Sequence, residues 1–218
     1  MRIRILSVFL LISNFIFAGW TNMNTGINDK LTGVVFWGTN GVVSGYKGIY
    51  YTTNGGNGPG SWTRFNISGN SADSLVYTHT QFYHAYSDMV YGSNKVFACG
   101  KDTVAGKAVI MLFNLPALTY SIIYTGPVNS SLNRIAYCSQ NTSYYAVGNN
   151  GLVVNFNATT SSAVISNLSY DLKAINFSTV KFFLVADGVF ISGTNNSNNF
   201  RDNNEHYCLL SLEQSVCD

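Results

Sequence analysis

Charged side chains are scarce in this 218-residue sequence, where Asp, Glu, Lys and Arg together make up 10% of the residues. A soluble domain usually carries about 25%. The net charge of +2 is too small to indicate a nucleic-acid-binding protein, which shows a marked basic surplus. An apolar content of 46% with so little net charge also argues against an intrinsically disordered chain.

Proline and long hydrophobic runs are scarce as well. The sequence has three prolines, and its longest apolar run is Ile5–Phe17. A membrane-spanning helix needs roughly 20 apolar residues, so this run is too short to span. Because Arg2 and Arg4 precede the run and Ala18 follows it, residues 1–18 are predicted to be a signal peptide. The alternative is a buried N-terminal helix.

Cleavage near Ala18 would make the remaining chain secreted, periplasmic or attached to the cell surface, with no membrane span in the mature protein. It would also remove Arg2 and Arg4, which supply the net charge of +2. The mature chain is therefore expected to be formally neutral.

Neutral polar residues stand where charges are missing. The chain has 26 Asn, 23 Ser, 17 Thr and 20 Gly, and 14% of its residues are aromatic. Gly and Asn favour tight turns, whereas aromatic and β-branched residues favour strands. The composition predicts an all-β domain of ordinary size with a substantial core.

Four cysteines allow three disulfide pairings, between which the sequence does not choose. In an exported protein we expect a disulfide between Cys208 and Cys217, which lie nine residues apart. Cys99 and Cys138 lie in apolar, strand-like segments and are expected to be small buried hydrophobes. A zinc site built from His206 and the two C-terminal cysteines would lack a CxxC pair, so we expect no metal site.

An internal repeat organises the chain. The Trp, Thr and Asn of the segment 20–24 recur in the segment 62–66, at an offset of 42 residues. A period of about 40 to 50 residues is typical of four-stranded propeller blades.

A second recurring unit is a strand-like alternation, a turn, a strand that ends in glycine, and a further strand that begins with glycine. Four copies are traced, and each copy comprises three segments: 31–36, 42–45 and 48–51; 86–91, 96–100 and 108–113; 132–137, 145–148 and 151–154; and 172–177, 183–186 and 188–191. Alignment on Val34, Met89, Ile135 and Ile175 gives spacings of 55, 46 and 40 residues. Glycine suits these hairpins because it adopts positive φ without strain.

These units predict a β-propeller-like fold of about four four-stranded blades over residues 19–194. Residues 195–218 form an Asn-rich loop and a C-terminal strand or tail in this interpretation. The fourth strand of the last blade could come from Tyr207–Leu212, or from Trp20–Asn24, which would close a four-bladed ring. An incomplete propeller arc is the alternative, and a β-sandwich is a third.

One turn carries a family resemblance, through Thr52, Asn54, Gly56, Ser61 and Trp62. It resembles the Asp-box repeats of sialidases and, more closely, those of the photosystem II stability/assembly factor-like β-propellers. Those families have a Ser/Thr-x-Asp-x-Gly-x-Thr-Trp turn between the third and fourth strands of a blade. Here Asn54 replaces the Asp and the loop is longer. The resemblance implies a propeller fold and a role in assembly or surface interaction.

Asn54 and Trp62 of this turn are predicted to have structural roles. The Asn54 side chain is expected to hydrogen-bond its own turn, and Trp62 is expected to pack between sheets.

The search for catalytic residues gives no site. A sialidase needs three arginines on the substrate carboxylate and a Tyr nucleophile paired with a Glu. Arg64, Arg134 and Arg201 could supply the arginines, but the only glutamates, Glu205 and Glu213, lie in the C-terminal tail. We therefore expect no catalytic residues and no cofactor, and keep a sialidase-like glycoside hydrolase as the alternative.

The segment 77–91 is rich in tyrosine and is expected to be a loop. Tyrosine-rich loops on rigid scaffolds make adaptable binding surfaces, so Tyr83, His84 and Tyr86 are the candidate binding residues. The alternative is that these rings fill the space between blades. The sequence thus predicts an exported, non-enzymatic propeller that binds a protein or a glycan. A structural or adhesive surface subunit that completes its ring as a homo-oligomer is the other alternative.

Overall fold

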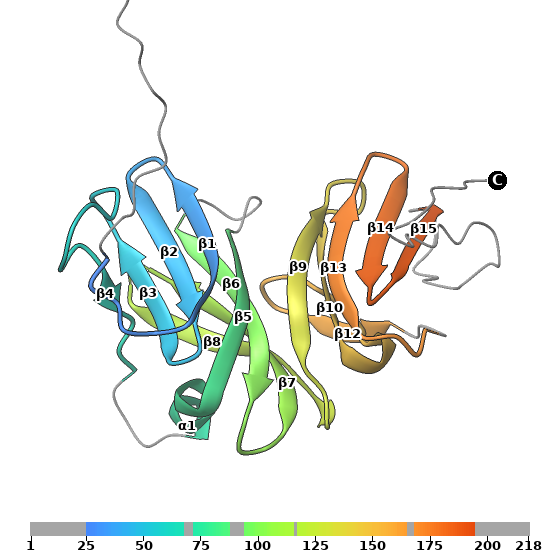
Figure 1. The fold of residues 1–218 in the computed structure, drawn as a ribbon, viewed down its shortest axis with the longest axis horizontal. Helices are drawn as coiled ribbons and strands as arrows, with labels where there is room; N and C mark the ends of the chain where they lie inside the picture. The colour runs from blue at the N-terminus through green and yellow to red at the C-terminus, as the bar shows by residue number, and fades with distance from the viewer. Residues whose placement is uncertain (1–24, 68–71, 88–93, 116, 165–167, 195–218) are drawn as a thin grey trace, which may run out of the picture.

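The protein folds into four antiparallel sheets that follow one another along the chain (Figure 1). The computed structural model describes residues 25–67, 72–87, 94–115, 117–164 and 168–194. In every sheet the strands pair in the order in which they occur in the sequence. Three sheets have four strands and the last has three described strands.

The strand bounds are as follows. The first sheet contains β1 (Leu31–Trp37), β2 (Asn40–Gly45), β3 (Gly48–Thr52) and β4 (Thr63–Arg64). The second contains β5 (Thr80–Ser87), β6 (Lys95–Asp102), β7 (Lys107–Asn114) and β8 (Thr119–Val128). The third contains β9 (Leu132–Cys138), β10 (Ser143–Gly148), β11 (Val153–Phe156) and β12 (Ser161–Val164). The fourth contains β13 (Leu172–Phe177), β14 (Lys181–Ala186) and β15 (Val189–Thr194). Helix α1 (Ala72–His79) precedes β5, and the short 3-10 helix η1 (Asn149–Gly151) lies between β10 and β11.

Three apolar layers separate the four sheets. Alternate residues of each strand point to opposite faces, so the inner sheets contribute to two layers each. Phe65 and Phe113 meet edge to face between the first and second sheets, at 5.1 Å between ring centroids. The ring centroids of Phe97 and Tyr144 lie 4.8 Å apart in the layer between the second and third sheets. Leu172 is buried in the layer between the third and fourth.

Each innermost strand, β1, β5, β9 and β13, carries a one-residue bulge near its start. The residue before the bulge is apolar in all four strands: Leu31, Phe82, Leu132 and Leu172. The bulged residues are Thr32, Tyr83, Asn133 and Lys173. A bulge at the same place in every blade defines which residues are structurally equivalent.

This equivalence corrects the alignment of the second unit. The residue that matches Val34 is Ala85, three residues after Phe82, and the innermost strand is Thr80–Ser87 and not 86–91. The true spacings are 51, 50 and 40 residues (34 to 85, 85 to 135, 135 to 175). Met89 lies outside the described residues. Helix α1 ends at His79 and β5 begins at Thr80, so no turn residues mark the start of this strand in the sequence.

The four sheets form an incomplete propeller arc and not a two-sheet sandwich (Figure 1). Among the described strands, no ladder joins the first sheet to the fourth, so these residues do not form a closed four-bladed ring. The two segments considered for its closure, Trp20–Asn24 and Tyr207–Leu212, lie outside the described residues. The same holds for the signal peptide 1–18 and for the Cys208–Cys217 disulfide.

The two described cysteines are free and buried, as expected. Cys99 belongs to the layer between the second and third sheets, and Cys138 to the layer between the third and fourth. Burial raises the pKa of the Cys99 thiol far above its usual range, so this group behaves as a small hydrophobe. Within the described ranges, no helix is long and apolar enough to cross a membrane.

Candidate functional site

A cleft of about 700 Å³ lies where the innermost strands of the four sheets converge. It is therefore the central cleft of the arc, and it continues onto the outer face of the fourth sheet. Its lining comprises Val34, Val35, His84, Ala85, Tyr86, Ser87, Arg134, Ile135, Ala136, Ala174, Ile175, Asn176, Phe183, Val185 and Phe190.

His84 links two blades at the wall of this cleft. Its side chain is 8% exposed, and its Nδ1 accepts a hydrogen bond from the main-chain N–H of Ile135 at 3.3 Å. Burial and, to a smaller extent, the positive charge of Arg134 lower the pKa of the imidazole to about 4. At neutral pH the ring is uncharged, and because Nδ1 accepts, the ring proton belongs on Nε2.

Tyr86 lies beside His84, with the ring centroids 6.3 Å apart, and lines the same cleft. Burial raises the pKa of its phenol, so it is a neutral hydroxyl at physiological pH. Tyr83 occupies the bulge of β5 and packs against Tyr46, at 5.7 Å between ring centroids. The structure therefore places two of the three candidate binding residues in the cleft, and the third against the first sheet.

The predicted location of these residues on a loop is wrong. The segment 72–87 forms helix α1 and the innermost strand β5. Tyr77, on the helix, is buried against Phe82 and Phe113. Loops tolerate exposed rings, but Tyr77 and Phe82 are buried in the layer between the first and second sheets.

Arg134 is an exposed cation on β9 and lines the cleft. In the sequence, Arg134 stands out only as one of the three arginines that a sialidase would need. Arg64 lies on β4, the outermost strand of the first sheet, where its guanidinium donates to the carbonyl of Lys47. Arg201 lies outside the described residues. The two described arginines therefore occupy opposite edges of their sheets and do not share a site.

Three lining residues from the fourth sheet escaped the sequence analysis. Phe183 and Phe190 stack at 5.8 Å with an interplanar angle of 26°, and Asn176 lies opposite Phe183 in the β13–β14 ladder. These residues belong to ordinary strand patterns, so composition did not mark them. The repeat position does, because Asn176 is equivalent to Tyr86, four residues after the apolar residue that precedes the bulge.

The lining of the cleft contains one cation and one neutral histidine, and none of the described lining residues is acidic. No group of three His, Cys, Asp or Glu side chains in the described part of the chain could hold a metal ion. The arrangement offers a positive charge, ring faces and amide groups on rigid strands. Such a site can bind an anionic, partly apolar ligand.

The turn that resembles an Asp box is held by its own side chains. Asn54 Oδ1 accepts hydrogen bonds from the Thr52 hydroxyl at 2.8 Å and from the Gly56 N–H at 3.3 Å. The Trp62 indole N–H donates to the Gly56 carbonyl at 3.0 Å, and the Ser61 hydroxyl donates to the carbonyl of Asn57 at 2.5 Å. These contacts make the turn structural.

The prediction that Trp62 packs between two sheets is wrong. Trp62 is half-buried on the outer face of the first sheet, edge to face with Phe36 at 5.8 Å between ring centroids. The difference arises because the described residues place no sheet before the first one.

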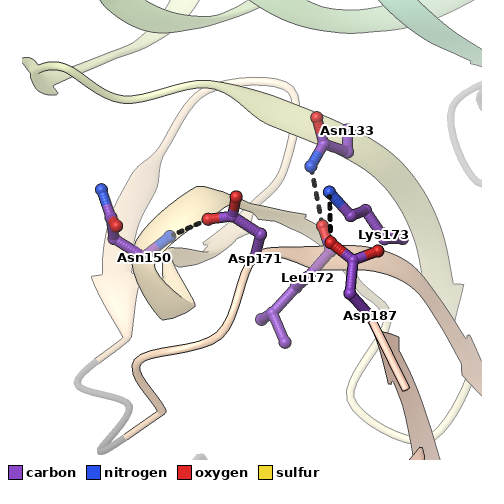
Figure 2. Close-up of polar contacts among 6 residues, drawn as sticks. All are labelled: Asn133, Asn150, Asp171, Leu172, Lys173 and Asp187. Carbon is purple, nitrogen blue, oxygen red and sulfur yellow. Dashed lines mark hydrogen bonds and ion pairs between the residues drawn. The ribbon is translucent and has the colours of Figure 1, made fainter. Parts of the chain in front are cut away.

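Polar contacts join the third and fourth sheets at one end (Figure 2). The Asn133 amide donates to the Leu172 carbonyl at 2.8 Å, and the main-chain N–H of Asn150 donates to the Asp171 carboxylate at 3.0 Å. Lys173 and Asp187 form an ion pair within the fourth sheet at 3.2 Å.

Comparison with known proteins supports the fold alone. No family model and no curated protein matches this sequence. Among solved structures, YCF48 bound to a D1 peptide is similar, with 12% identity and a TM-score of 0.53 over 78% of this chain and 50% of that chain. The extracellular domain of the one-component system BT4673 from B. thetaiotaomicron has 13% identity and a TM-score of 0.56 over 77% of this chain and 22% of that chain.

A GH74 enzyme from Niastella koreensis is also similar, with 12% identity and a TM-score of 0.57 over 79% of this chain and 30% of that chain. The chain thus spans half or less of the length of these structures. An assembly factor and a glycoside hydrolase share the fold, so the fold does not decide between binding and catalysis. The described chain has the β-propeller fold that its repeats and its resemblance to the photosystem II assembly factor-like propellers predicted.

Proposed function

We propose that this protein is an exported, non-enzymatic propeller that binds a segment of a protein in its central cleft. The observation that carries the proposal is the charge of the cleft. Arg134 is its exposed cation, His84 is neutral, and no described lining residue is acidic. Such a lining favours an anionic group, for example the carboxylate of an Asp, a Glu or a chain terminus.

The same lining argues against glycoside hydrolysis. Hydrolysis by the usual mechanism needs two carboxyl groups about 5 to 9 Å apart on either side of the scissile bond. The described aspartates near the fourth sheet have other partners: Asp171 accepts from the Asn150 N–H, and Asp187 pairs with Lys173. Neither lines the cleft.

The walls of the cleft favour a polypeptide over a sugar. Beside Arg134, Tyr86 offers a ring face to apolar side chains. This ring projects from a paired strand, so little ordering entropy is lost when a ligand binds. The similar YCF48 structure, described as bound to a D1 peptide, is a precedent for peptide binding by this fold.

The test uses an array of 12-residue peptides, half of them with Asp or Glu and half with Asn or Gln at the same positions. We expect the acidic peptides to bind more tightly, and Arg134→Gln to weaken their binding about tenfold, which corresponds to about 1.4 kcal/mol. The matched control is Arg64→Gln on the outer strand β4, which should leave the dissociation constant unchanged. Added salt should weaken binding to the wild type and have little effect on Arg134→Gln.

Two results would contradict the proposal. One is equal binding of acidic and amide peptides by the wild type, with no effect of Arg134→Gln. The other is turnover of a fluorogenic glycoside panel by the purified chain that is lost in Arg134→Gln, which would favour the sialidase-like alternative.

A further inference from the structure

The two ends of the arc each present an apolar sheet face that has no neighbouring sheet among the described residues. The first face, on the outer side of the first sheet, contains Leu31, Val34 and Phe36. The last face, on the outer side of the fourth sheet, contains Phe183, Val185 and Phe190. Figure 1 shows these sheets, with β1 in blue and β14 in orange, at opposite ends of the arc.

The repeat shows that the first face has the composition of a buried layer. Val34 is 62% exposed, whereas the equivalent residues Ala85, Ile135 and Ile175 are 3%, 1% and 4% exposed. In those three blades this position packs against the preceding sheet. The first face therefore has the side chains of an inter-blade layer and no partner for them in the described chain.

The last face also has an exposed residue at a position that is buried in the other three blades. Val185 pairs with the first residue after the bulge of β13, and it is 41% exposed. The residues at the same position in the other blades are each 0% exposed: Ser44, Cys99 and Val147. Cys99 and Val147 pack against the following sheet, and Ser44 hydrogen-bonds the Thr32 hydroxyl at the bulge of its own sheet.

We propose that two copies of this chain assemble head to tail, the last face of each against the first face of the other, and close one ring. Every internal junction joins a face of the last kind to a face of the first kind, so this contact repeats a geometry that the chain forms three times. The contact is heterologous, and two such contacts close a two-fold ring when the curvature of the arc permits.

Charge supports this pairing. At the junction of the third and fourth sheets, the β10–β11 turn donates through Asn150 N–H to Asp171, the residue directly before β13. In the proposed junction the same turn of the fourth sheet carries Asp187, whose side chain is 80% exposed. The residue directly before β1 is Lys30, which is also exposed. The equivalent contact would join Asp187, which pairs with Lys173 in the single copy, to Lys30 of the other copy, which contacts Tyr46 in the single copy.

Hydrogen bonding at the bulge also supports the head-to-tail contact. Thr32 and Asn133, at the bulges of the first and third sheets, donate to the carbonyl of the residue before the bulge in the next sheet, Phe82 and Leu172. Lys173 occupies this position in the fourth sheet and carries a donor. In the ring it lies where it can reach the Leu31 carbonyl of the other copy.

Length is consistent with two copies. The match that covers 78% of this chain covers 50% of the YCF48 chain, so two arcs supply about the length of that one propeller chain. The full chain is also nearly neutral, with a net charge of +2 over 218 residues, so little charge repulsion opposes its self-association.

The experiment measures the mass in solution by size-exclusion chromatography with light scattering. The full chain is expressed with its N-terminal segment, so that the host can process it. We expect a mass of two chains for the wild type. Val34→Glu and Val185→Glu should each give monomers, because each variant loses both junctions of the ring. Both positions are exposed in one copy, so the melting temperature of the monomers checks that they remain folded.

Mixing the two variants is the decisive step. The intact last face of Val34→Glu can join the intact first face of Val185→Glu, so the mixture should give a dimer held by this one junction, while each variant alone does not. The second junction, between the two substituted faces, stays open. The matched control is Val104→Glu in the β6–β7 turn. Val104 is 72% exposed and lies on neither face, so this variant should stay dimeric. A mixture that stays monomeric overturns the head-to-tail contact.

Other outcomes also overturn the proposal. A monomeric wild type would mean that another occupant, such as the remainder of this chain, covers the faces. Loss of the dimer in only one of the two variants would indicate a symmetric contact, and species that grow with concentration would indicate open filaments. Arg134→Gln should remain dimeric, so failure of the ring and failure of cleft binding are separate results.

Discussion

The side-chain amide of Asn133 donates to the main-chain carbonyl of Leu172 at 2.8 Å, and so joins the bulge of β9 to the start of β13 (Figure 2). The Thr32 hydroxyl makes the equivalent contact two junctions earlier, between the first and second sheets, to the Phe82 carbonyl at 2.7 Å. The bulge frees its residue from the strand ladder, so the side chain can reach the next blade. The bulges therefore hold consecutive blades at one end.

Asn133→Ala removes the donor and leaves the Leu172 carbonyl without this partner. We expect the free energy of unfolding to fall by about 1 kcal/mol, as for a typical lost hydrogen bond. Urea unfolding followed by tryptophan fluorescence measures it. The control Asn28→Ala changes an exposed asparagine and should cost less than about 0.5 kcal/mol. Equal losses in both variants would contradict a role for the bulge in joining the blades.

His84 should make stability depend on pH below neutrality. Its pKa is about 4 in the folded protein and 6.5 in the unfolded chain, so between these values the unfolded state binds more protons. Stability therefore falls as the pH is lowered through 6.5 towards 4. The loss from this group should be about 2 kcal/mol between neutral pH and pH 5.

The measurement is urea unfolding of the wild type and of His84→Gln at both pH values. Glutamine can still accept from the Ile135 N–H but does not titrate. The wild type should lose about 2 kcal/mol more than the variant on acidification. Parallel losses would show that other groups cause the pH dependence.

Gly56 should tolerate no side chain. Its φ is +73°, and an added Cβ would lie 2.5 Å from the Trp62 ring. Gly55 has a φ of +82° but no atom within 4 Å of such a Cβ. Gly55→Ala thus reports the backbone strain alone, about 1 kcal/mol, and Gly56→Ala should cost at least about 1 kcal/mol more. Equal melting temperatures of the two variants would mean that the Trp62 contact is not stabilising.

Gly148 should not tolerate a side chain either, because the start of β9 passes close to it. An added Cβ would lie 1.8 Å from the carbonyl oxygen of Ser131, a main-chain atom that cannot move alone. We expect Gly148→Ala to lower stability by about 3 kcal/mol in urea unfolding. The fourth sheet carries Ala186 at the same repeat position, opposite Leu172.

The reverse change, Ala186→Gly, is the matched comparison. It should cost about 1 kcal/mol or less, because only a methyl group and some backbone restriction are lost. If Gly148→Ala is equally mild, the close approach of β9 is not a constraint on the fold.

Much of the fold could be predicted from local sequence. The alternation in β1, β9 and β13 and the glycines at the strand ends gave three of the four units in their observed places. The second unit was misplaced because β5 follows helix α1 directly, at Thr80, with no turn residues between them. Without a turn signal, local sequence does not show where a strand begins, and the pairing of β5 with β6 decides it.

The candidate site was predicted less well. His84 and Tyr86 were chosen from composition, and both line the cleft. Arg134, Asn176 and Phe183 were not assigned to it, because residues 134 and 176 come together only when separate blades converge. The repeat makes Asn176 equivalent to Tyr86, but it does not show that residues of separate blades meet in one cleft.

The sequence by itself determined that this is a charge-poor, all-β repeat protein, because alternation and turn residues act within a few positions along the chain. Only the tertiary structure decided that the blades form an arc with two open faces. Val34 and Ile135 occupy the same repeat position and have similar side chains, yet one is exposed and the other is buried. The difference is the presence of a neighbouring sheet, which is a property of the assembled fold and not of the residue.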